Sequence, residues 1–129
     1  MKAPKAPVSW GELIDKITIL ELKVENLVEP DSIKNVSNEL HLLEEIYSIC
    51  LEYNTKVSSS REKLKSINSK LWHIEDSIRE KERKKDFGKD FIELARSVYL
   101  TNDLRAQIKR EINTLVGSEL VEEKSYKPY

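Results

Sequence analysis

The sequence predicts an all-α protein, a helical bundle of about four helices in up-and-down order. Charged residues make up 35% of the 129 residues and apolar residues 39%, with only 3 Gly and 4 Pro, which is typical of amphipathic helices with solvated outer faces. Apolar residues also recur at steps of three and four, the spacing of one helical face. We expect one helical domain over 1–129, with a short flexible arm at 1–8 and an irregular tail at 118–129.

The first helix is expected to begin at Ser9 and to run to about Val28. Ser9 and Glu12 have the spacing of a capping box, and Pro30 cannot continue a helix. Most apolar residues of this segment share one arc, but Ile19 and Leu22 lie on the opposite side. Apolar groups on two sides predict packing against more than one neighbour, so we expect a homo-oligomer.

A second helix should follow Pro30, with Asp31 as its N-cap. Its apolar residues recur with heptad-like spacing, which predicts a continuous buried stripe: Ile33, Val36, Leu40, Leu43, Tyr47 and Cys50. Cys50 is the single cysteine of the chain, so it cannot form an internal disulfide. We expect it to be a small buried apolar side chain in a reducing compartment.

The sequence leaves open whether 31–85 is one long helix or two. We favour a break within 54–60, because this stretch is polar and because Ser59 and Glu62 have capping-box spacing. The apolar stripe also changes frame there. One continuous helix stays an alternative, since apolar residues partly bridge the two stripes.

The last long helix is expected between two glycines. The charged run 79–85 is typical of a solvated helix end, and Gly88 marks the turn that follows. Asp90 and Glu93 have the spacing of another capping box, and Gly117 is placed to end the helix as a C-cap.

The charge balance argues against two classes of partner. Lys and Arg total 22 against 23 Asp and Glu, so the net charge of -1 supplies no excess positive field for nucleic acid or an anionic membrane. No segment is apolar over the roughly 18 residues that a membrane span requires, and residues 1–7 lack the apolar core of a signal peptide. We expect no nucleic acid, no membrane and a cytoplasmic location.

Two cations in the last helix are the most informative feature of the sequence. Arg105 and Lys109 lie one turn apart near the middle of an apolar arc, where a charge needs a partner. Asn102 lies on the same flank, and Glu21 and Glu75 fall on the apolar sides of other helices. These five residues predict an internal polar cluster in which the cations neutralise an anion, Asn102 orients it, and a glutamate positions a base or a counter-charge.

This cluster has three interpretations: ion pairs that fix helix register, a site for an anionic ligand, or a subunit interface. We expect a small protein that binds an anionic small molecule. The alternative is a non-catalytic, oligomeric protein–protein interaction module, whose partner contacts Ile19, Leu22, Tyr126 and Tyr129. Whether the protein is an enzyme is left open.

A metal site is not expected. Glu12 with Asp15, and Glu75 with Asp76, are carboxylate pairs of the kind that hold Mg²⁺ beside a phosphate. However, Glu12 has a capping role, Asp15 points away from the main arc of its helix, and adjacent carboxylates diverge by about 100°. Neither histidine has a second ligand at metal-like spacing. We therefore expect no cofactor, with Mg²⁺ as the alternative.

The segments 10–20, 71–76, 94–99, 102–106 and 108–113 resemble a family of short, uncharacterised, all-helical bacterial and phage-associated proteins. This resemblance spans most of the chain. It implies a shared fold and carries no assigned activity.

Two other helical families are similar in type only. Glu12 and Asp15, with the later Asn102, Arg105 and Lys109, are similar to the carboxylate and basic motifs of all-α nucleoside triphosphate pyrophosphohydrolases. That resemblance implies an Mg²⁺-dependent nucleotide pyrophosphohydrolase as a further alternative, although those enzymes carry denser Glu-rich motifs. Helical chorismate mutases also hold carboxylates with Arg and Lys inside a bundle, without a shared motif.

Overall fold

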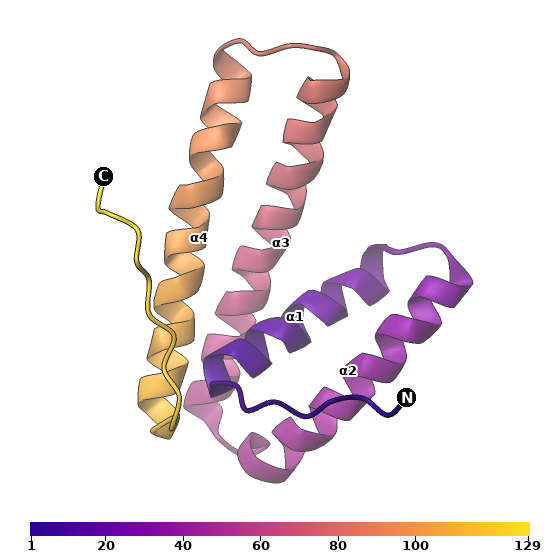
Figure 1. Ribbon diagram of the computed structural model, residues 1–129, viewed down its shortest axis with the longest axis vertical. Helices are drawn as coiled ribbons and strands as arrows, with labels where there is room; N and C mark the ends of the chain where they lie inside the picture. The colour runs from indigo at the N-terminus through magenta and orange to yellow at the C-terminus, as the bar shows by residue number, and fades with distance from the viewer.

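The computed structural model describes residues 1–129 and contains four α-helices and no strand (Figure 1). The helices are α1 (Trp10–Asn26), α2 (Pro30–Leu51), α3 (Thr55–Arg83) and α4 (Lys89–Val116). The predicted all-α bundle is therefore confirmed. No helix combines the length and the apolar character that a bilayer crossing requires.

The start of α1 follows the predicted capping signal. Ser9 is the N-cap, and its hydroxyl accepts a hydrogen bond from the backbone N–H of Glu12 at 3.1 Å. The Glu12 carboxylate does not return to Ser9, because it binds Lys109 of α4 instead. The helix ends at Asn26, two residues before the expected end, and Leu27 leaves it in an extended conformation.

The segment 31–85 forms two helices, as favoured, but the break comes earlier than the predicted cap. Asn54 is the N-cap of α3, and its side-chain oxygen accepts from the backbone N–H of Val57 at 3.1 Å. Ser59 lies inside α3, so the capping box expected there is wrong. Val57 is completely buried, and starting the helix at Asn54 places it in the core.

Two other predicted caps are also wrong. Pro30 is the first residue of α2, so Asp31 lies within the first turn and not at the N-cap. Gly88 is the N-cap of α4, and Asp90 again lies within the first turn. At the other end, Gly117 has φ 60° and ψ 46°, the left-handed conformation expected of a helix-ending glycine.

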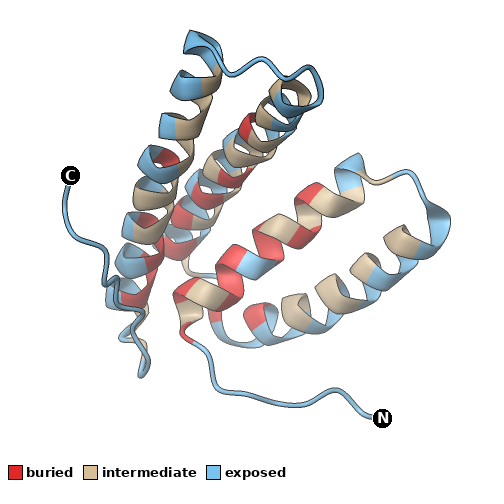
Figure 2. Ribbon diagram, turned by 45° about the horizontal axis from the view of Figure 1, so that its top comes forward, coloured by how far each residue is buried: buried red, intermediate tan, exposed pale blue.

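Helix α1 is the centre of the molecule. It packs on α2 along one side and on α3 and α4 along the other, while α3 and α4 pair along most of their lengths (Figure 1). Figure 2 shows buried residues along most of the length of α1, and α1 has more of them than any other helix. The core that it organises draws on all four helices: Leu13, Ile14, Ile17, Tyr47, Leu51, Val57, Leu64, Ile108 and Ile112.

This central position explains the two apolar sides of α1 within one chain. Leu22, on the second side, is only 4% exposed, and Ile19 is half-buried, so neither is the freely exposed contact expected from the sequence. The pattern that predicted an oligomer is therefore satisfied by α2 on one side and by α3 and α4 on the other. The prediction that Cys50 is a buried apolar side chain is wrong, because Cys50 is exposed.

Helices α1 and α4 approach closely at a glycine. The backbone N–H of Gly11 donates to the Asn113 side-chain oxygen at 2.7 Å. A β-carbon at Gly11 would lie 2.5 Å from the backbone carbonyl oxygen of Lys109, which is too close for any real contact. The absence of a side chain at Gly11 thus sets how near α1 can come to α4.

We predict that Gly11→Ala destabilises the protein by about 1–3 kcal/mol, the usual cost of overpacking. In an isolated helix, replacing glycine by alanine is stabilising. A loss of stability here would therefore come from the clash with the Lys109 carbonyl. Urea unfolding of the two proteins measures the difference. Gly88→Ala is the control, because its new β-carbon would meet only the flexible Asp86 carboxylate at 3.3 Å. Equal stability of Gly11→Ala and wild type would contradict the close approach.

Candidate functional site

The site is built around the carboxylate of Asp15, which is 1% exposed. Asp15 lies on the side of α1 that faces α3 and α4. Its Oδ1 accepts from Arg105 Nε at 2.9 Å and from Asn68 Nδ2 at 2.9 Å, and its Oδ2 accepts from Arg105 Nη2 at 2.5 Å. Two parallel bonds to one guanidinium are the strongest arrangement available to a buried carboxylate. Asp15 therefore ties α1 to both neighbouring helices.

A second polar layer extends this network along α1. The Thr18 hydroxyl, which is completely buried, donates to the Asp15 backbone carbonyl at 2.8 Å. The same hydroxyl accepts from Asn68 Nδ2 at 2.9 Å. No buried side-chain nitrogen or oxygen in the chain lacks a hydrogen-bond partner. The polar groups between these helices are thus fully paired, as a stable interior requires.

Lys109 is the second cation of this region, and its side chain is 8% exposed. Its Nζ lies 2.7 Å from a Glu12 oxygen, 2.6 Å from a Glu122 oxygen and 4.0 Å from Asp15 Oδ2. Burial alone would lower the pKa of Lys109, but hydrogen bonds to Glu12 and Glu122 outweigh it and raise the pKa. The 118–129 tail therefore contributes a partner to Lys109.

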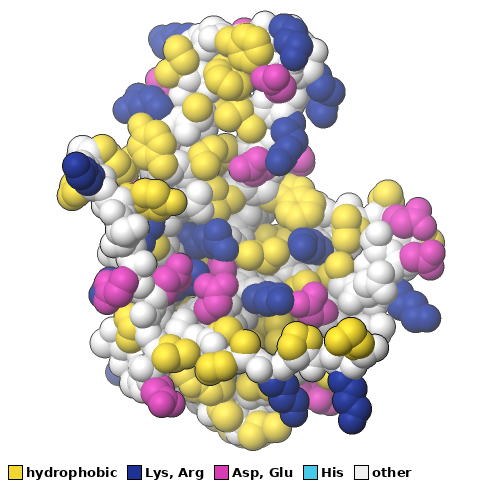
Figure 3. Space-filling model, viewed as in Figure 1, with side chains coloured by type: hydrophobic (Ala, Val, Ile, Leu, Met, Phe, Trp, Pro, Cys, Tyr) yellow, Lys and Arg dark blue, Asp and Glu magenta, His cyan; other side chains and the backbone are white.

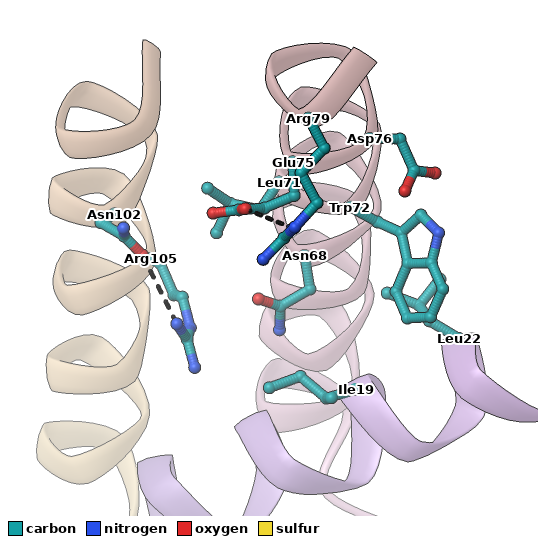
Figure 4. Close-up of a pocket in the computed structure, with 10 residues that line it drawn as sticks. All are labelled: Ile19, Leu22, Asn68, Leu71, Trp72, Glu75, Asp76, Arg79, Asn102 and Arg105. Carbon is teal, nitrogen blue, oxygen red and sulfur yellow. Dashed lines mark hydrogen bonds and ion pairs between the residues drawn. The ribbon is translucent and has the colours of Figure 1, made fainter. Parts of the chain in front are cut away.

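Arg105 has an inner edge and an outer edge with different surroundings. The hydrogen bonds of the inner edge to Asp15 raise its pKa against the opposing effect of burial. On the outer edge, Nη1 has only a long contact of 3.4 Å with the Asn102 side-chain oxygen. Figure 4 shows this guanidinium in the space between α4 and α3, pointing toward α1. Asp15 thus fixes the position of Arg105 while its outer N–H groups stay available.

Arg105 and Asn102 line a cleft of about 450 Å³ between α1, α3 and α4. Across the middle of this face, side chains of both charges lie side by side (Figure 3). Within the cleft, Arg79 Nη1 donates to a Glu75 oxygen at 2.7 Å. The lining combines apolar, amide and charged groups: Ile19, Leu22, Asn68, Leu71, Trp72, Glu75, Asp76, Arg79, Asn102 and Arg105 (Figure 4).

Three of the five residues singled out in the sequence line this cleft, namely Asn102, Arg105 and Glu75. Lys109 is not part of the lining, because its ammonium group is held between Glu12 and Glu122.

Glu21 does not join them either. It pairs with Arg61 at 3.0 Å and with Lys65 at 3.3 Å, which ties α1 to α3 at a different place. Arg61 also binds Glu44 of α2 and lies over the Tyr47 ring. The single predicted cluster is therefore divided. Arg105, Lys109 and Asn102 lie around Asp15, whereas Glu21 belongs to a network around Arg61 and Glu75 pairs with Arg79.

The sequence analysis considered Asp15 only as a metal ligand and missed it as the partner of Arg105. Asp15 appeared to point away from the arc of α1, but α1 has a second covered side, and Asp15 lies on that side. A signal for it exists in the sequence: Gly11, Asp15, Thr18 and Leu22 follow heptad spacing, and all four are buried. Asp15 and Thr18 are polar, so the spacing of apolar residues alone does not reveal this second stripe.

Of the carboxylates considered as metal ligands, Glu12, Asp15 and Glu75 are used in ion pairs, whereas Asp76 is not. Glu12 binds Lys109, and Asp15 binds Arg105. No group of three or more His, Cys, Asp and Glu side chains is placed to hold a metal ion.

Fold and site together define an all-α helical bundle whose paired polar core borders an amphipathic cleft. The chain belongs to a family of unknown function, DUF6165, whose model matches residues 4–129. This agrees with the expected membership of an uncharacterised helical family. Neither the curated proteins nor the solved structures contain a match to the chain.

We predict that Arg105→Ala destabilises the protein by about 3–5 kcal/mol, because it leaves the Asp15 carboxylate buried without its main partner. Urea unfolding measures the loss. Arg96→Ala is the matched control on the same helix, since Arg96 is largely exposed and its contact with Glu93 is a surface pair. Similar losses in both variants would show that the Asp15–Arg105 pair does not hold the bundle together.

Lys109 should make stability fall at alkaline pH. Its folded-state pKa lies above the ordinary value of 10.5, so its contribution is complete below that pH and is lost as pH rises through the folded-state pKa. We expect the drop in unfolding free energy between about pH 8 and pH 11.5 to be smaller in Lys109→Met than in wild type. Lys16→Met, which removes a lysine that is 55% exposed, is the control. An unchanged drop in Lys109→Met would count against the buried ion pairs.

Proposed function

We propose that the protein binds a small organic anion in the cleft between α1, α3 and α4. The observation that supports this is the divided use of Arg105: Asp15 holds its inner edge, and its outer edge contacts Asn102, which lines the cleft together with Arg105. An immobilised guanidinium loses little conformational freedom when it binds a carboxylate or phosphate. Arg105 and the Asn102 amide would therefore contact the anionic group.

The walls of the cleft favour a ligand with an apolar body. Ile19, Leu22, Leu71 and Trp72 all contribute to the lining. A volume of about 450 Å³ falls in the range of small-molecule sites, which are mostly apolar with a few convergent polar groups. A molecule of this kind would place its anionic group on Arg105 and its apolar body against Trp72.

The acidic residues of the cleft limit the charge of the ligand. Glu75 and Asp76 lie on α3, and Arg79 pairs with Glu75. A second anionic group near these carboxylates would be repelled, so a monoanion is favoured over a polyanion such as a nucleoside triphosphate. In this proposal Glu75 would act as the counter-charge that the sequence analysis expects.

The proposal requires binding and no catalytic step. The cleft lining contains no Ser, Cys, His or Lys, and its Glu75 carboxylate is engaged by Arg79. A nucleotide hydrolase would need free carboxylates around Mg²⁺. Glu12 and Asp15 are paired with cations instead, which favours a binding protein.

The cleft contains one of the two tryptophans, so Trp10→Phe leaves Trp72 as a specific fluorescence probe. We expect 3-phenylpropionate or phenyl phosphate to change Trp72 fluorescence saturably and to raise the melting temperature. Phenethylamine carries the same ring with a positive charge and should do neither. In the same background, Asn102→Leu should weaken the anions roughly tenfold, because it removes a polar group beside Arg105.

Arg96→Gln is the matched control on α4, because Arg96 does not line the cleft. It should bind the anions as wild type does. The proposal is rejected if anions and phenethylamine act alike, if Asn102→Leu binds as well as Arg96→Gln, or if none of the probes gives a saturable change.

A further inference from the structure

Helix α2 carries an apolar stripe on the side that faces away from α1. Leu42, Ile46, Ile49 and Tyr53 follow one another at steps of four, three and four, with Tyr53 in the turn after the helix. Their exposed fractions are 57%, 47%, 84% and 91%. We call these four residues the α2 face. They form one line of large apolar side chains that no part of the chain covers.

The α2 face is distinct from the stripe that attaches α2 to the bundle. Leu40, Leu43 and Tyr47 point inward and pack with the core. In Figure 2, buried residues run along α1, whereas α2 is intermediate or exposed except near its end. Helix α2 therefore has apolar residues on two sides, as α1 has, but only one of its sides is covered. A contiguous exposed apolar stripe is typical of an interaction surface.

The spacing indicates which kind of partner fits. Steps of four and three are the a and d positions of a coiled coil, whose side chains insert between those of a facing helix. A partner helix that lies along α2 can bury all four side chains together, even though the α2 face is not a groove. The α2 face thus matches an amphipathic helix.

Charge next to the face selects against antiparallel pairing with a second copy of the chain. Glu45 and Glu52 occupy the same flanking position in consecutive heptads, while the opposite flank holds the uncharged Leu43 and Cys50. The last turn of α2 contains no basic residue, so the negative end of its helix dipole adds to Glu52. Two α2 helices packed antiparallel would bring Glu45 against Glu52 of the other copy, which is unfavourable.

We propose that the α2 face docks an amphipathic helix of a partner protein, with Leu or Ile at a and d positions and Lys or Arg beside them. The partner's cations would pair with Glu45 and Glu52, and its apolar residues would cover Ile46 and Ile49. This surface lies outside the cleft between α1, α3 and α4, so it is independent of the proposed anion site.

The test uses two fluorescent peptides of about 21 residues, or three heptads, with Leu at a and d. One carries Lys at e and g and the other carries Glu. Fluorescence anisotropy with the full chain should show saturable binding of the Lys peptide and at least roughly tenfold weaker binding of the Glu peptide. Ile49→Gln should weaken the Lys peptide by about tenfold or more, as loss of a central apolar contact does.

Charge reversal and a matched control make the test specific. Glu45→Lys with Glu52→Lys should exchange the preference, so that the Glu peptide binds better. Ile92→Gln removes a 54% exposed apolar side chain from α4 and should leave peptide binding unchanged. Circular dichroism confirms that each variant keeps its helices.

Three results would overturn the proposal. These are no saturable binding of either peptide, equal binding of both, and equal losses in Ile49→Gln and Ile92→Gln. Light scattering tests the alternative that a second copy of the chain occupies the α2 face. If the wild type is a dimer and Ile49→Gln is a monomer, the α2 face is a dimer interface and the proposal is also overturned.

Discussion

The ion pair between Asp15 and Arg105 is the interaction on which the rest of the structure depends. A carboxylate that is 1% exposed carries a large desolvation cost, which only well-oriented donors can offset. Arg105 of α4 and Asn68 of α3 supply those donors, so one alignment of α1 against both helices satisfies Asp15. Gly11 allows α4 to come near enough for this pairing, because it places no side chain against the Lys109 backbone.

The same pair connects the core to the cleft. Arg105 has more N–H groups than Asp15 can accept, and the surplus faces outward beside Asn102. Structural pairing and ligand binding are therefore not exclusive explanations for this arginine. Its inner edge serves the fold, and its outer edge gives the cleft a cation whose position is already set. Lys109 is different, since Glu12 and Glu122 occupy its ammonium group.

Helices α1 and α2 differ in how their two apolar sides are used. Both sides of α1 are covered within the chain, which makes it the centre of the bundle. Only one side of α2 is covered, and Leu42, Ile46, Ile49 and Tyr53 stay exposed on the other. The molecule consequently offers two separate surfaces, a polar and apolar cleft on one side of α1 and an apolar line on the outside of α2.

The sequence by itself determined the fold class and the ends marked by Ser9 and Gly117, because periodicity and capping depend on residues a few positions apart. It favoured two helices over 31–85, and the structure decided between two helices and one. The sequence also showed that Arg105 needs a partner. Only the tertiary structure decided that the partner is Asp15 and not Glu21, since this depends on how α1 crosses α4 at Gly11. The choice of Asn54 over Ser59 as a cap was tertiary as well, because the core must bury Val57.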